Sequence, residues 1–194
     1  MTKQLLTEQF SQHRTRLWRT VQVRMDPRLY GRVDPDDVLQ EAYMDAIKRV
    51  GHFAEELSYS PFVWLRLIVG QTLINVHRRH IGAKKRDASR ERSRSGGGLR
   101  FEYSATSQTI AMQLAGNQTS PSQAAIRSEM VEELSASLAS LSEIDREILT
   151  LRHFEDLSNK EVAELLGIEQ KAASIRYVRA VQRLKKCMEK NSFG

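Results

Sequence analysis

The sequence predicts an all-α protein made of two small helical domains joined by a flexible linker, the second domain ending in a helix-turn-helix. Three observations support this fold class. Apolar residues recur at spacings of three and four, which is the period of an α-helix and not that of a strand. Only four prolines and ten glycines interrupt the 194 residues. A polar stretch divides the apolar segments into two groups, and a hydrophobic content of 40% suffices for a modest core in each.

The first domain is predicted over residues 1–87 and contains three helices. The first helix covers residues 5–23. Asp34 then precedes Pro35 and two further acids, a pattern typical of a helix amino terminus because it supplies a cap and complements the helix dipole. A third helix runs over residues 62–79. The side chains expected in the core of this bundle are Leu6, Phe10, Leu17, Val21, Leu39, Ala42, Tyr43, Ala46, Val50, Phe62, Leu65, Val69, Leu73 and Val76.

The linker is predicted over residues 88–123. Its composition is polar, with SRSGGG at residues 93–98, and such a segment cannot build a core. Residues 78–100 carry nine basic and two acidic side chains. This charge fits contact with a nucleic acid and equally well a solubilising tether. A short helix around residues 110–114 is the one regular element expected in the linker.

The second domain is predicted over residues 124–194 and begins with two helices. Ser142 has the type and position of a cap for the second of them. The side chains expected in the core from these two helices are Ile126, Met130, Leu134, Leu138, Ile144, Ile148 and Leu151.

A helix-turn-helix follows over residues 157–184. Ser158 and Glu161 have the spacing of a capping box, which marks the start of the first helix. Gly167 lies where the chain must reverse, and glycine takes the positive φ that such a turn needs. This arrangement is the one that places a second helix in a DNA major groove.

The second helix of this motif has an apolar and a cationic side. The residues expected to face inward are Ala173, Tyr177, Ala180 and Leu184, and those expected outside are Lys171, Arg176, Arg179 and Arg183. No acidic residue occurs over residues 170–188. A solvated helix face usually mixes both signs, so a face of one sign favours a polyanionic partner over an ordinary helical hairpin.

Charge and hydropathy restrict the class of protein further. The formal net charge of +6 is compatible with a nucleic acid or an anionic membrane as partner. The longest apolar run, at residues 62–76, contains Arg66 and is shorter than the roughly 20 residues of a membrane span. The amino terminus lacks an apolar signal core. We therefore expect a cytoplasmic protein without membrane insertion.

No residue pattern predicts catalysis or a cofactor. Cys187 is the only cysteine, which excludes an internal disulfide and a Cys-based zinc site. His77 and His80 have ligand-like spacing, but no carboxylate or thiol neighbour completes a metal site, so we expect both on a helix surface. Neither a pocket-like carboxylate cluster nor a glycine-rich phosphate loop occurs. We expect a protein that is not an enzyme and that holds neither cofactor nor metal.

Three segments, in this order, resemble a known family. They are DPDDVLQEAYMDAIKR at residues 34–49, FVWLRLIVGQTLINVHRR at residues 62–79 and LSEIDREILTLRHFEDLSNKEVAELLGI at residues 141–168. Together with the two-domain layout, they closely resemble an alternative sigma factor of bacterial RNA polymerase, of the extracytoplasmic-function (ECF) type within the sigma-70 family. The resemblance implies a protein that binds core RNA polymerase and directs promoter-specific transcription initiation.

The resemblance also implies a role for each domain. Residues 1–87 correspond to sigma region 2, which binds core polymerase and recognises and melts the −10 element, and residues 124–194 to sigma region 4, which reads the −35 element. Core-polymerase binding falls to Asp37, Gln40 and Glu41, which share one side of a helix. Contact with the −10 element falls to Phe53, Tyr59, Asn75, Arg78 and Arg79. Contact with the −35 element falls to Lys160, Gln170, Lys171, Ser174, Arg176 and Arg179. Core polymerase and promoter DNA are the implied partners, with an anti-sigma factor as a further one.

Several of these residues have a structural interpretation as well. Trp64 fits core packing better than base stacking. Phe53 and Tyr59 lie where the family's capture loop lies, and either fits loop packing too. For Asp37 and Glu41 the alternative is a solvated acidic helix face.

The helix assigned to upstream recognition departs from the family pattern. Gln170 and Lys171 open it where the family has an acid and a glycine, and Ile175 stands where a small polar residue is common. The base preference of this helix therefore stays open. Arg176 and Arg179 are retained and fit phosphate contact.

The alternative function is a stand-alone dimeric helix-turn-helix transcriptional regulator. Such a regulator binds palindromic sites strongly without polymerase. It gives residues 34–49 no role.

Overall fold

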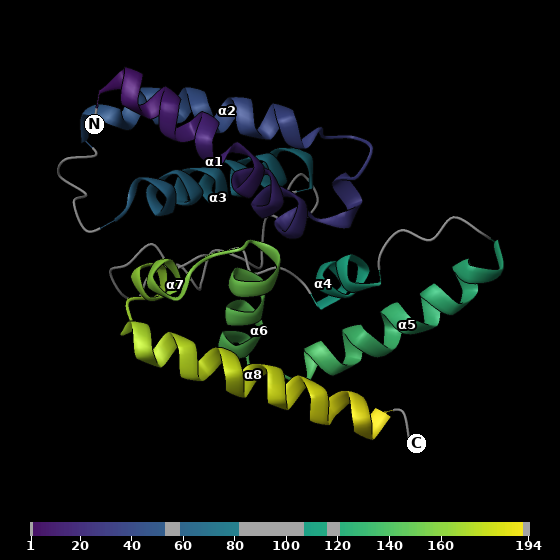
Figure 1. The fold of residues 1–194 in the computed structure, drawn as a ribbon. Helices are drawn as coiled ribbons and strands as arrows, with labels where there is room; N and C mark the ends of the chain where they lie inside the picture. Colours follow the sequence, from purple (N-terminus) through teal and green to yellow (C-terminus); the bar gives the residue numbers. More distant parts are fainter. Residues whose placement is uncertain (1, 53–58, 82–106, 116–120, 192–194) are drawn as a thin grey trace. The chain divides into compact units, whose positions relative to one another are not determined.

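The computed structural model describes residues 2–52, 59–81, 107–115 and 121–191. Every regular element in these ranges is helical, which confirms the predicted all-α class. The chain divides into two compact units, Met1–Ser104 and Ala105–Gly194 (Figure 1). No helix in the described ranges is long and apolar enough to cross a membrane.

The first unit contains three long helices, each of which packs against the other two. These are α1 (Lys3–Arg24), α2 (Pro35–Arg49) and α3 (Pro61–His80), with short 3-10 turns η1 (Pro27–Leu29) and η2 (Val50–His52). Asp34 caps α2 as predicted, because its carboxylate accepts a hydrogen bond from the Asp36 amide at 2.8 Å. Ser60 caps α3 in the same way.

The core of this unit contains the apolar side chains that the helical period predicts. Leu17, Val21 and Leu65 are fully buried. Phe10 and Tyr43 are half-buried, and their rings lie 5.0 Å apart between α1 and α2. Trp64 is 2% exposed, so its indole is core packing and not a stacking platform.

His77 differs from its prediction as a surface residue, because it is buried on α3. Its Nε2 accepts a hydrogen bond from the Asp26 amide at 3.3 Å, which holds the turn η1 against α3. Burial lowers the pKa of His77 to about 4. The Arg28 guanidinium, which donates to the Asp26 carboxylate at 2.6 Å, holds the pKa of Asp26 below its usual value. The sequence gives no signal for the contact of His77 with Asp26, which lies 51 positions away.

The second unit contains five α-helices and one π-helical segment among the described residues. They are α4 (Ser107–Leu114), α5 (Pro121–Ala139), α6 (Glu143–Leu149), the π segment η4 (Thr150–Phe154), α7 (Asn159–Leu166) and α8 (Gln170–Asn191). Helix α8 packs against α5, α6 and α7. The Ser142 cap on α6 is as predicted, because its hydroxyl accepts from the Asp145 amide at 3.2 Å.

Helix α4 lies inside the segment predicted as a flexible linker, residues 88–123. It packs along α5 and buries Ile110 and Ala111 completely. Over residues 107–115 the structure therefore differs from the predicted flexible linker. The few apolar residues of this segment suffice for a helix that packs against α5. Only the short helix expected around residues 110–114 anticipated it. The predicted domain boundaries at residues 87 and 124 remain predictions.

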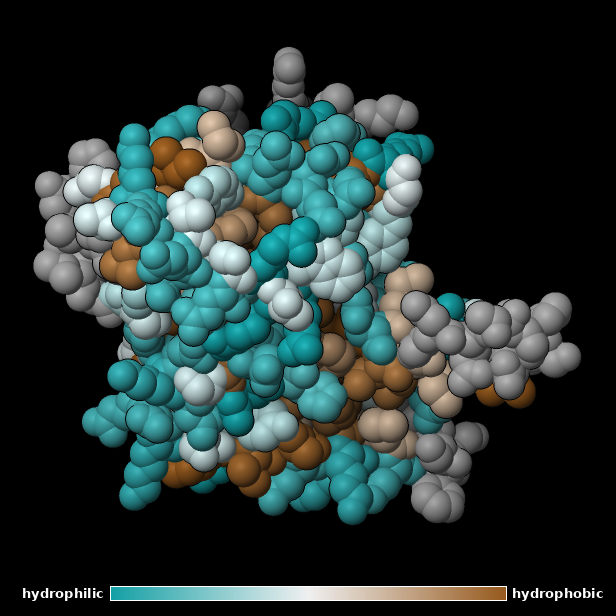
Figure 2. Space-filling view, turned by 45° about the horizontal axis from the view of Figure 1, so that its top comes forward, coloured by the Kyte–Doolittle hydropathy of each residue, from teal (hydrophilic) through white to brown (hydrophobic). Residues whose placement is uncertain are grey.

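Helix α5 also differs from its predicted core face. Leu134 and Leu138 are buried, but Ile126 is 62% exposed and Met130 46% exposed. Figure 1 shows the carboxyl-terminal end of α5 beside α8 and its amino-terminal end extending away. Apolar residues are also visible at the surface in Figure 2, where brown residues lie among the hydrophilic ones in teal. The apolar period of α5 therefore continues beyond the part of the helix that the core covers.

Candidate functional site

The helix-turn-helix is built by short-range contacts that the sequence predicts. The Ser158 hydroxyl accepts from the Glu161 amide at 3.2 Å, and the Glu161 carboxylate accepts from the Ser158 amide at 2.7 Å. This capping box starts α7. Gly167 takes φ +63° after the helix, and the next amide, of Ile168, donates to the Ala163 carbonyl at 3.0 Å. The chain reverses there, and α8 begins at Gln170.

Helix α8 has the two faces that its sequence predicts. Ala173 and Ala180 are fully buried, while Tyr177 and Leu184 are half-buried. The cations Lys171, Arg176, Arg179 and Arg183 are exposed, as predicted. The residues predicted to read the upstream element are exposed at Lys160, Gln170, Lys171, Arg176 and Arg179 and half-buried at Ser174. All except Lys160, which lies on α7, belong to α8, so the fold gathers them on one helix.

An ion pair that the sequence did not predict joins α6 to α8. The Arg183 guanidinium donates to the Asp145 carboxylate, whose side chain is only 5% exposed. The Arg183 side chain itself is 57% exposed. One member of the predicted cationic face therefore holds α8 in position. The only local signal at Asp145 is its capping pattern with Ser142, which indicates no partner on α8.

A second arginine connects the π segment to α8. The guanidinium of Arg152 lies over the Tyr177 ring, 5.4 Å from its centre, and donates to the Leu157 carbonyl. Cations near an aromatic face are attracted by the ring quadrupole. This contact fixes the segment that leads into α7 against the inner face of α8.

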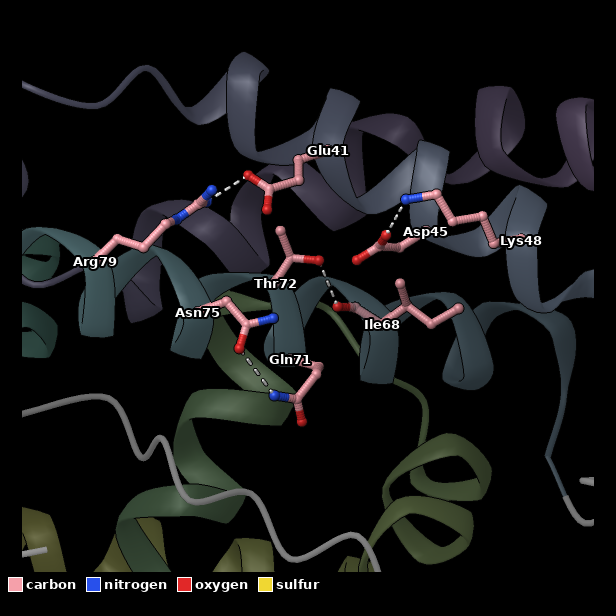
Figure 3. A network of polar contacts seen from close by, with 8 residues as sticks. All are labelled: Glu41, Asp45, Lys48, Ile68, Gln71, Thr72, Asn75 and Arg79. Carbon is pink, nitrogen blue, oxygen red and sulfur yellow. Dashed lines mark hydrogen bonds and ion pairs between the residues drawn. The ribbon is translucent and has the colours of Figure 1, made fainter.

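The residues predicted to bind core polymerase lie on α2. Asp37 and Gln40 are exposed, and Glu41 is half-buried. The Glu41 carboxylate accepts from the Arg79 guanidinium on α3 at 2.6 Å (Figure 3). The sequence predicts different partners for these two residues, polymerase for Glu41 and DNA for Arg79. The fold instead brings them into direct contact.

The other residues predicted to contact the −10 element are partly described. Arg78 is exposed near the carboxyl terminus of α3. Asn75 is half-buried, and its Oδ1 accepts from Gln71 Nε2 at 3.5 Å (Figure 3). Tyr59 is half-buried just before α3, and Phe53 lies outside the described residues. The described members thus lie at or near the two ends of α3 and do not form one cluster.

Among the residues that the structure describes, no group of three or more histidine, cysteine, aspartate or glutamate side chains is arranged to hold a metal ion. On α8, the exposed side chains of Lys171, Arg176 and Arg179 offer positive charge and hydrogen-bond donors. A cationic helix face attracts phosphate, and its side-chain donors reach base edges.

Comparison with known proteins finds one family match, which lies within the second unit. Residues 131–184 match the family model for Sigma-70, region 4. The match begins within α5, contains α6 and the whole helix-turn-helix, and ends within α8. No curated protein matches the chain. A similar solved structure, described as CnrH in complex with the cytosolic domain of CnrY, has a TM-score of 0.49 at 16% identity, covering 97% of this chain and 90% of that chain.

Proposed function

We propose that this chain is a sigma factor of the ECF type, a non-catalytic subunit that binds core RNA polymerase and directs it to specific promoters. The observation that carries the proposal is the match of residues 131–184 to Sigma-70, region 4. That match falls on a helix-turn-helix with a complete capping box and an exposed cationic second helix.

In this proposal α8 enters the major groove at the −35 element. Arg176 and Arg179 lie on its exposed side and attract backbone phosphates, which fix the register of the helix. Gln170 and Lys171 lie exposed in the first turn, the part of a recognition helix that contacts base edges. Each bidentate contact of such a side chain with the correct base is worth about 1–3 kcal/mol.

The first unit binds core polymerase and the −10 element in this proposal. Asp37 and Gln40 supply exposed acidic and amide groups on α2, which suit a basic surface of the polymerase. Arg78 and Arg79 supply cations at the end of α3. Because Arg79 is paired with Glu41 in the structure, a phosphate competes with that carboxylate for the guanidinium, and full contact with DNA opens the ion pair. An anti-sigma factor as third partner rests on the sequence resemblance.

Transcription in vitro tests the proposal. Core polymerase is incubated with genomic fragments, with and without the protein, and transcripts are mapped. We expect new, discrete start sites that depend on the protein. Asp37→Arg should abolish them by removing association with polymerase, whereas Arg176→Ala together with Arg179→Ala should leave that association intact and lose the start sites.

The stand-alone regulator predicts a different pattern of results. In that case the purified chain binds palindromic DNA strongly without polymerase, and Asp37→Arg changes nothing. Failure of the wild-type chain to co-migrate with sigma-free polymerase at low salt, where surface charges are least screened, contradicts the sigma proposal.

A further inference from the structure

Helix α8 exposes apolar side chains among its cations. Ile175 is 42% exposed, Val178 is 50% exposed and Val181 is 43% exposed. Single exposed apolar residues are common and need no explanation. Three within seven residues, on a helix otherwise rich in arginine and lysine, form a defined feature of the surface.

Helix geometry separates these three residues into two groups. With about 100° per residue, Ile175 lies about 170° and Val178 about 130° from the centre of the buried stripe. They belong to the outermost row of the helix, which is Lys171, Ile175, Val178 and Gln182 at spacings of four, three and four. Val181 lies only about 70° from the buried stripe, on the flank of the helix.

The outermost row is bordered by cations. Arg179 and Arg176 follow one another along one side of it, at about 130° and 70° from the buried stripe. Both are exposed. A helix that lies in a major groove places its flanking cations at the phosphates and its outermost row at the base edges. A row that begins with Lys171 and has arginines along one side therefore suits DNA better than an apolar protein surface.

The base edge offers one apolar group to such a pair. Of the groups that the four base pairs present in the major groove, the C5-methyl of thymine is the only apolar group larger than a ring C–H. Ile175 and Val178 have no donor or acceptor on their side chains, so neither can read a hydrogen-bonding group.

We propose that Ile175 and Val178 read thymine C5-methyl groups in the upstream promoter element. The inference rests on the proposed function, because it requires α8 in the major groove. It deepens that function by naming the base chemistry that the central, outermost part of the helix selects.

The test replaces thymine by deoxyuridine, which differs only in lacking the C5-methyl group. The upstream element of a promoter found by the transcription assay is substituted one thymine at a time. Binding of the full chain with core polymerase is then measured for each duplex. We expect one or two positions at which deoxyuridine weakens binding about fourfold, the equivalent of about 0.8 kcal/mol for burying one methyl-sized group.

The variants assign the effect to side chains. Ile175→Ala or Val178→Ala should weaken binding to thymine and remove the difference between thymine and deoxyuridine at its own position. Val181→Ala is the matched control, an exposed β-branched residue on the same helix but on its flank. It should keep the full difference. Because these side chains are exposed, unchanged melting temperatures are expected for all three variants.

Three results overturn the inference. The first is that deoxyuridine is neutral at every position. The second is that Ile175→Ala and Val178→Ala keep the discrimination between thymine and deoxyuridine. The third is that both variants weaken association with polymerase, which would make this face a protein contact. Failure of the proposed function is seen earlier and separately, because then the first assay yields no start sites.

Discussion

Replacing Arg183 by methionine tests how α8 is held in place. The substitution keeps an unbranched apolar stem and removes the guanidinium that pairs with Asp145. Asp145 is then left as a carboxylate with a side chain that is 5% exposed. Its amide still donates to the Ser142 hydroxyl, so the cap of α6 survives. The perturbation therefore acts on one charge pair between two helices.

The magnitude follows from the exposure of the two partners. Removing one partner of a fully buried pair costs about 3–5 kcal/mol, because the other charge stays desolvated. Here the Arg183 side chain is 57% exposed, so water already screens the pair. Asp145 also lies in the first turn of α6, where the helix dipole favours a negative charge by about 0.3–1 kcal/mol. We expect Arg183→Met to lower the free energy of unfolding by about 1–2 kcal/mol.

A double-mutant cycle in urea measures this interaction. Asp145→Asn and Arg183→Met are made singly and together, and unfolding is followed by circular dichroism. We expect a coupling energy of about 1 kcal/mol, since the double variant leaves no unpaired buried charge. Arg179→Met is the control, an exposed arginine on the same helix that should change stability by less than about 0.5 kcal/mol. A coupling energy indistinguishable from zero refutes the assignment of Arg183 to this role.

Three other predictions concern local features. The free energy of unfolding, measured in urea titrations, should fall by up to about 3 kcal/mol between pH 6.5 and pH 4. In this range the unfolded chain binds a proton at His77, while the folded chain, in which the pKa of His77 is about 4, does not. A His77→Gln variant with the same pH dependence as the wild type contradicts this. Gly167→Ala should lower the free energy of unfolding by about 1 kcal/mol. The cause is backbone strain alone, since φ is +63° and an added Cβ meets nothing within 4 Å. An unchanged free energy of unfolding excludes backbone strain at this position. A double-mutant cycle on Glu41 and Arg79 should give a coupling energy of about 0.2–1 kcal/mol. This coupling should decline with salt, because both side chains are more than a third exposed. A coupling energy that salt does not change contradicts an electrostatic origin.

Features encoded within one helical turn could be predicted from the sequence. The caps at Asp34 and Ser142, the box of Ser158 and Glu161, and the turn at Gly167 all form where expected. Each depends on residues no more than three positions apart, or on the φ preference of one residue. The apolar period likewise predicts the inner faces of α1, α2, α3 and α8, because it records which side of a helix must leave water.

Contacts between helices could not be predicted in the same way. The pairs Glu41 with Arg79 and Asp145 with Arg183 each join residues 38 positions apart. A helical period identifies the polar side of each helix but not which charge on it meets which neighbour. The burial of His77 and the exposure of Ile126 have the same cause, since both depend on where a neighbouring element ends.

The two ion pairs reduce the positive charge that the described surfaces offer to phosphate. From the sequence alone, Arg79 and Arg183 both belong to the cationic surface available for phosphate. In the fold, each of them pairs with a carboxylate of its own unit. Because affinity for DNA depends on the number of phosphates neutralised, we expect each such pairing to weaken one phosphate contact of the free chain. If polymerase binds Glu41 as proposed, we expect it to compete with Arg79 for that carboxylate, whereas the Asp145 side chain, only 5% exposed, is shielded from such competition. We therefore expect Arg79 to become available to DNA when its ion pair opens, and Arg183 to stay part of the scaffold that presents α8.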